Sequence, residues 1–259
     1  MTWTVRHVAA SGLIALSSLA VAITAEEPPV DPVVKAVSTA NEKLIGWQTK
    51  EAREALDPIK DKAADNATVA AALAQVLVQE KKYPDAVKQM EAAAKLAPSD
   101  AGLQLSLGDT LLLVRRNADA TAAFRRAARL AEEAVKKDEK DTRALFQLAQ
   151  AQQRLREFDK AAATLAKLVE ASEGKDTMAL YELGVTQTFQ GKWQEAFDAL
   201  SKALEKNKGI AYAYYYRGLA AEKLNRKDVL INDMSRFLAL APGAPEASRA
   251  QAILNAARR

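Results

Sequence analysis

The chain has 259 residues, a formal net charge of +4 and no cysteine, which excludes disulfides, thiol nucleophiles and thiolate metal sites. Its one histidine is His7, in a segment that we expect to be removed, so histidine-dependent catalysis and nearly all zinc sites are excluded as well. Acidic and basic residues are interleaved without a long basic run, so we expect no nucleic-acid partner. Catalysis by carboxylate, lysine or tyrosine side chains stays open, but no spacing of these residues suggests it. We therefore expect that the protein is not an enzyme and that it binds no metal and no cofactor.

The N-terminus has the pattern of an export signal. Arg6 is the one charged residue before a small, apolar stretch at residues 8–23, a small-apolar-small sequence stands at residues 20–22, and two glutamates follow at 26 and 27. This order predicts a signal peptide over residues 1–25. The alternative is an uncleaved N-terminal anchor, although the run is short and serine-rich for a spanning helix. We expect a periplasmic or secreted protein, or an inner-membrane-anchored one that faces the periplasm, with this segment as its one membrane contact.

Two short regions follow the signal. Residues 26–32 are predicted to form a stiff, Pro-rich linker, since proline lacks a backbone N–H and disfavours helix in the residue before it. Residues 33–66 are predicted to form a pair of helices. Whether this pair is a degenerate repeat or a plain cap stays open, because Pro58 falls inside its second helix.

Residues 67–242 repeat one pattern of small and bulky residues. The predicted units are 67–100, 101–141, 142–176, 177–210 and 211–243. Numbered from the first residue of each unit, positions 4, 7, 8 and 11 share one face of a first helix, and positions 20, 24 and 27 share one face of a second. Small residues at positions 8 and 20, such as Gly108 and Ala120, would let the two backbones approach. A bulky residue at position 24, such as Phe124, would fill the gap that this leaves.

The ends of the units carry further signals. Extra residues before Thr142 predict that Asp119 to Lys137 form one long helix. Residues 244–259 are predicted to be a C-terminal capping helix, because apolar residues recur there at helical spacing.

The repeated pattern resembles the tetratricopeptide repeat, and with its signal the chain resembles exported bacterial members of that family. Tryptophan is absent from position 4, and Leu230 stands at position 20 of the last unit, where a small residue is usual. The resemblance implies an all-α fold, a right-handed α-solenoid of helix-turn-helix (TPR-like) hairpins. It also implies a concave groove that the first helix of each unit lines.

The groove residues follow from this resemblance. The expected peptide-binding residues are Leu105, Phe146, Gln150, Arg154, Tyr181, Val185, Phe189, Tyr212, Tyr215 and Glu222. Aromatic residues with an apolar body and a polar tip suit peptide recognition. The alternative is that these aromatic residues pack between units as core, as an apolar helical stripe commonly does.

These expectations lead to one functional hypothesis and one alternative. The hypothesis is an exported scaffold in the bacterial cell envelope that binds a segment or helix of a partner protein in its concave groove. The alternative is a self-associating, homo-oligomeric structural subunit of an envelope complex. The sequence identifies neither the partner nor the pathway.

Overall fold

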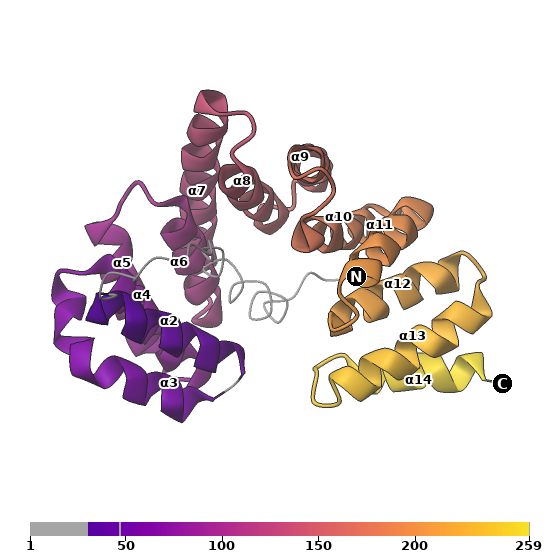
Figure 1. The fold of residues 1–259 in the computed structure, drawn as a ribbon, viewed down its shortest axis with the longest axis horizontal. Coiled ribbons are helices and arrows are strands. Elements are labelled where there is room, and N and C mark those ends of the chain that lie inside the picture. Colours follow the sequence, from indigo (N-terminus) through magenta and orange to yellow (C-terminus); the bar gives the residue numbers. More distant parts are fainter. Residues whose placement is uncertain (1–30, 47, 259) are drawn as a thin grey trace, which may run out of the picture. The chain divides into compact units, whose positions relative to one another are not determined.

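The computed structural model describes residues 31–46 and 48–258 (Figure 1). The predicted signal peptide and most of the predicted linker lie outside the described residues. Within them every regular element is a helix, which confirms the all-α prediction. The chain forms two compact units, an N-terminal one that ends at Leu130 and a C-terminal one that begins at Ala131.

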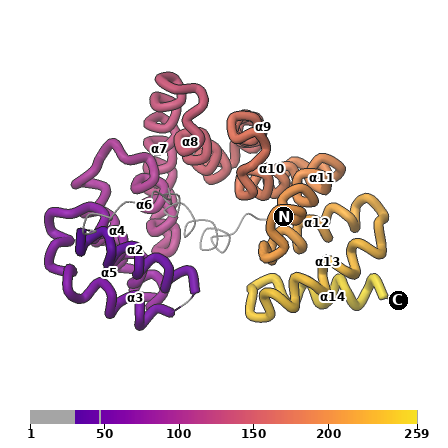
Figure 2. Tube along the Cα trace, viewed as in Figure 1, coloured from indigo at the N-terminus to yellow at the C-terminus, as the bar shows by residue number. Residues whose placement is uncertain are grey.

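The N-terminal unit is a series of helix hairpins (Figure 2). Its elements are α2 (Pro32–Ile45), α3 (Thr49–Leu56), the 3-10 helix η1 (Asp57–Ala64), α4 (Ala67–Gln79), α5 (Tyr83–Leu96), α6 (Ala101–Leu113) and the first part of α7 (Asn117–Lys137). Helix α2 packs on α3 and on α4, α4 packs on α5, and α5 packs on α6. Each helix therefore pairs with its neighbour in sequence, as stacked hairpins require.

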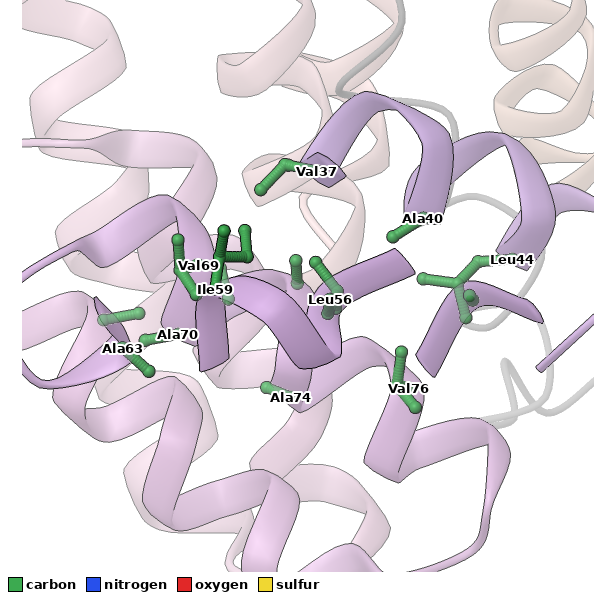
Figure 3. Close-up of a cluster of buried hydrophobic side chains, with 14 of the residues drawn as sticks. Val37, Ala40, Leu44, Leu56, Ile59, Ala63, Val69, Ala70, Ala74 and Val76 are labelled. Carbon is green, nitrogen blue, oxygen red and sulfur yellow. The ribbon is translucent and has the colours of Figure 1, made fainter. Parts of the chain in front are cut away.

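The core of this unit begins in the region before the predicted repeats. Figure 3 shows Val37, Ala40 and Leu44 of α2 beside Leu56 and the side chains of α4. Ala40 and Leu56 are fully buried, at the positions where a repeat would bury them. The second helix of this pair ends at Leu56, and η1 begins with Pro58 in its first turn, because proline cannot continue the α-helical hydrogen bonds.

The C-terminal unit continues the same arrangement. After the end of α7, it contains α8 (Thr142–Arg154), α9 (Phe158–Ala171), α10 (Thr177–Gln190), α11 (Trp193–Lys206), α12 (Ala211–Lys223), α13 (Lys227–Leu240) and α14 (Ala247–Ala257). From α8 to α14 every helix packs on the next one, and α10 also packs on α12. The first helices of the last two predicted repeats thus lie side by side.

Side-chain caps fix where most first helices begin. Asn66 accepts hydrogen bonds from the N–H groups of Thr68 (3.0 Å) and Val69 (3.1 Å) at the start of α4. Asp100, Asp141 and Asp176 cap α6, α8 and α10 in the same way. Helix α12 begins after Ile210 without such a cap. These caps satisfy N–H groups that have no partner within the helix.

One backbone conformation recurs in the turn between the two helices of each predicted unit. Position 15 has a positive φ in all five units, at Lys81 (61°), Arg115 (61°), Arg156 (62°), Gly191 (75°) and Asn225 (57°). Glycine adopts this conformation without strain, and lysine and arginine do so at a cost. The backbone therefore repeats with the period of the sequence.

Close helix contacts follow the predicted alternation of small and bulky residues. A Cβ atom added at Gly108 would overlap the ring of Phe124, and one added at Gly184 would lie 2.5 Å from Cγ of Leu200. Position 8 thus receives the bulky residue of position 24. The predicted long helix is also present, since α7 runs without a break from Asn117 to Lys137.

Candidate protein-binding site

The ten residues predicted to bind a peptide are unevenly distributed over the two units, and we call the nine that lie in the C-terminal unit the binding face. Leu105 lies on α6 of the N-terminal unit. The other nine lie on α8, α10 and α12, each of which is the first helix of a predicted repeat in the C-terminal unit. The binding face is therefore built by one compact unit.

Most of the ten side chains are buried. Six of them retain less than a tenth of their surface, namely Leu105, Gln150, Arg154, Tyr181, Val185 and Tyr215. Phe146, Phe189 and Tyr212 are half-buried, and Glu222 is exposed. The surface available to a partner in this structure therefore comes mainly from these last four residues.

Phe189 is held by rings on two other helices. Its ring stacks on Phe158 of α9, with centroids 5.4 Å apart and planes 9° apart. It also meets Tyr216 of α12 at a centroid distance of 6.3 Å. Phe158 is not among the residues that the sequence predicts to bind a peptide. The available signal was an aromatic residue as the first residue of a second helix.

Tyr212 and Tyr215 contact the end of the array. The ring centroid of Phe237 on α13 lies 5.4 Å from that of Tyr212 and 5.0 Å from that of Tyr215. The Tyr212 hydroxyl donates a hydrogen bond of 2.6 Å to Glu246, just before α14. Burial, together with this hydrogen bond, raises the pKa of Tyr212 well above its ordinary value. The two tyrosines thus tie α12 to α13 and to the start of α14.

A buried polar network joins α8 to α10. The amide nitrogen of Gln153 donates to Glu182 (3.0 Å) and to the hydroxyl of Thr186 (2.9 Å). Both Gln153 and Glu182 are almost fully buried. Nearby, burial raises the pKa of Tyr181, and the negative charge of Glu182 adds to the rise. Because buried polar groups need partners with fixed geometry, this network sets the position of α10 relative to α8.

A buried ion pair stabilises the last hairpin away from the binding face. Arg217 donates two hydrogen bonds of 2.8 Å to the carboxylate of Asp233, which is 2% exposed. Arg217 also reaches Ser201 of α11 at 3.3 Å. Burial raises the pKa of Asp233, while the hydrogen bonds from Arg217 oppose that rise. The other four predicted repeats have leucine at the position of Arg217.

The described residues also bear on metal binding and membrane insertion. Residues 31–46 and 48–258 contain no group of three or more Asp, Glu, His or Cys side chains that could hold a metal ion. In the same part of the chain no helix combines the length and the apolar character needed to cross a bilayer.

Known proteins share this repeat and this fold. A family model described as tetratricopeptide repeat matches residues 71–133, 124–176, 146–209 and 181–229. No curated protein sequence gives a significant match.

Solved structures extend the comparison. A tetratricopeptide repeat protein from Parabacteroides merdae is 13% identical, covers 89% of this chain and 86% of its own, and has a TM-score of 0.63. A thermophilic protein of the same kind from Thermus thermophilus is 16% identical, with coverages of 73% and 99% and a TM-score of 0.57. The pilF protein of Pseudomonas aeruginosa is 15% identical, with coverages of 85% and 97% and a TM-score of 0.55. At these identities the likeness is one of fold.

Proposed function

The chain belongs to the tetratricopeptide-repeat family, and from this premise we propose that it is an exported scaffold that binds a segment of a partner protein. Its general role is that of a protein–protein interaction scaffold. The binding face on α8, α10 and α12 is the surface that we assign to the partner. No catalytic step forms part of this proposal.

The observation that carries the proposal is the contrast within the binding face. Phe146 on α8 is half-buried and Glu222 on α12 is exposed, whereas the neighbouring Tyr181, Val185 and Gln150 are held in the interior. Accessible groups on a rigid support can be recognised without the cost of ordering them first.

The chemistry of the accessible residues indicates what a partner would present. Phe146 can gain from burial against an apolar side chain. Glu222 at the end of α12 can pair with a lysine or arginine, a contact that chiefly adds specificity and speeds association. We therefore propose a partner segment that combines apolar and basic residues.

The bacterial envelope is the proposed location, and it rests on the sequence of residues 1–25. Intact-mass measurement of the protein recovered from cells tests this part separately. A mass that begins after residue 25 supports a cleaved signal and a periplasmic or secreted protein. A full-length chain in the membrane fraction supports the inner-membrane-anchored alternative. A full-length chain in the cytoplasm contradicts export.

Charge reversal tests the binding face directly. Glu222→Lys is expected to weaken partner capture from envelope extracts and to leave the helix content by circular dichroism unchanged. The matched control is Glu170→Lys, since Glu170 is also exposed but lies on α9, a second helix. If both variants capture the same partners as the wild-type chain, or both lose them alike, Glu222 is not part of the binding surface.

A further inference from the structure

Helix α2 exposes large apolar side chains on one side. Val34 is 58% exposed and Ile45 is 49% exposed. They lie eleven residues apart, close to three turns, so they share one side of the helix about 16 Å apart along its axis. The adjoining side, with Val37, Ala40 and Leu44, is buried in the core of the N-terminal unit (Figure 3). We call the side with Val34 and Ile45 the apolar edge: it has an exposed apolar residue at each end, with Ser38 and Asn41 between them. The described part of the chain does not cover Val34 or Ile45.

A charged edge runs beside the apolar one. Lys35 and Glu42 are both exposed and stand seven residues apart, close to two turns, on the same side of α2. No ion pair within the described residues involves either of them. The exposed face of α2 thus has one apolar edge and one edge that carries a cation near its start and an anion near its end.

We propose that this face, which we call the α2 face, docks on the α2 face of a second copy of the chain. The two helices would lie antiparallel across a two-fold axis. In that arrangement Val34 meets Ile45 of the second copy, and Ile45 meets Val34 of the second copy. Lys35 then lies beside Glu42 of the second copy, and the reverse pair forms at the other end.

Self-complementarity is the reason for choosing a second copy over another partner. In antiparallel packing, like edges of the two helices meet, so the apolar edge covers itself. The same symmetry brings each charge to its opposite. A two-fold interface requires both matches at once, and one helix face supplies them without any further residue.

The expected association is weak. Helix α2 has 14 residues and is about 21 Å long, so the buried area falls below the roughly 1,200 Å² of a stable specific interface. We therefore expect a dimer that forms in the range of about 100 μM and dissociates on dilution. Its affinity should fall with added salt, because exposed ion pairs are screened.

Sedimentation equilibrium of the whole chain tests the apolar edge. The wild-type chain is expected to move from monomer to dimer between about 10 μM and about 1 mM at low salt. Ile45→Glu is expected to raise the dimer dissociation constant at least about tenfold. Leu240→Glu is the matched control, because Leu240 is 39% exposed and is the last residue of α13, as Ile45 is of α2. Leu240→Glu should dimerise like the wild type.

Charge exchange tests the two-fold geometry. Lys35→Glu and Glu42→Lys should each weaken the dimer about threefold or more, since each places like charges together twice. The double variant, or an equimolar mixture of the two single variants, should recover the wild-type affinity. A wild-type chain that stays monomeric at about 1 mM overturns the proposal. A dimer that is unchanged by Ile45→Glu, or not recovered by the charge exchange, overturns it as well.

Discussion

The N-terminal and C-terminal units build the same hairpin around different interiors. Both have a positive φ at position 15 and a small residue at position 8. In the N-terminal unit α4 buries Val69, Ala70 and Val76 completely. In the C-terminal unit α12 and α13 bury aromatic residues and the ion pair of Arg217 with Asp233. The hairpin therefore tolerates many interior side chains, but the larger and more polar ones depend on particular partners.

Removal of Arg217 should cause the largest loss of stability, and it should do so in the C-terminal unit. Arg217→Ala leaves the carboxylate of Asp233 buried without its cation, and we expect a loss of about 3–5 kcal/mol in the free energy of unfolding of the C-terminal unit. Urea denaturation followed by circular dichroism measures this loss. Arg217→Leu, which introduces the residue of the other four predicted repeats at this position, combined with Asp233→Ala removes both buried charges and should recover most of the stability. A loss for Arg217→Ala as small as that of an exposed pair, about 1 kcal/mol or less, contradicts the buried role.

Disruption of the contact between position 8 and position 24 should cause the next largest loss of stability. Gly184→Ala places a methyl group 2.5 Å from Cγ of Leu200, and such overpacking costs about 1–3 kcal/mol. The first predicted repeat already has Ala74 at this position. The expected loss of stability therefore arises from the contact with Leu200 and not from the hairpin itself. In a Leu200→Ala background the added methyl should cost much less, and a double-mutant cycle measures the coupling. Equal costs in both backgrounds would show that no such contact exists.

Alkaline pH should unfold the C-terminal unit selectively through its tyrosines. Burial raises the pKa of Tyr181 and of Tyr212 above the ordinary value of 10.0, so the folded state favours the protonated form. This stability is fully present below about pH 10 and is lost as the pH rises further, because the unfolded chain releases these protons first. Thermal melts from pH 8 upward should show the decline.

Tyr212→Phe sharpens the same test. Loss of the hydrogen bond to Glu246 should cost about 1 kcal/mol at neutral pH. The variant should then lose less stability than the wild type above pH 10, since one titrating group is gone. An alkaline decline identical to that of the wild type would exclude Tyr212 as a contributor.

A substitution in the hairpin turn should cause the smallest change in stability, and this change should be a gain and not a loss. Arg156 has a φ of 62°, which glycine adopts without a steric penalty, so Arg156→Gly should stabilise the chain by about 0.5–1 kcal/mol. Gly191→Ala, at the same position of the next unit, should destabilise it by a similar amount. Thermal denaturation of the two variants beside the wild type measures both changes. If both variants shift the midpoint in one direction, backbone strain is not the cause.

Much of the fold follows from residue spacing alone. The alternation of Gly184 and Leu200, and of Gly108 and Phe124, predicts two helices that pack closely, and the structure has these contacts. The extra residues before Thr142 predict the long helix α7. Spacing is sufficient here because helical periodicity determines which side of a helix each residue occupies.

The sequence did not predict the contacts between particular side chains. Periodicity places Gln153 on a first helix but does not show that its amide reaches Glu182 of the next unit. It does not show the partner of Arg217 either, because an ion pair depends on side-chain conformations and on the distance between helices. On the binding face, the sequence left open whether the aromatic residues are core or ligand contacts. Tyr212 and Tyr215 make core contacts with Phe237, and their contact with a partner stays a prediction.

Photo-crosslinking in cells from position 146 is the measurement that tests the binding face most directly. A photoreactive phenylalanine at Phe146 keeps an aromatic side chain that is half-buried, whereas Tyr181 is too buried to tolerate the change. Tyr83, a half-buried aromatic residue at the start of α5, is the matched control. We expect one dominant protein adduct from position 146 and none of that kind from position 83. No adduct from position 146, or the same adducts from both positions, would contradict a partner-binding face on α8, α10 and α12.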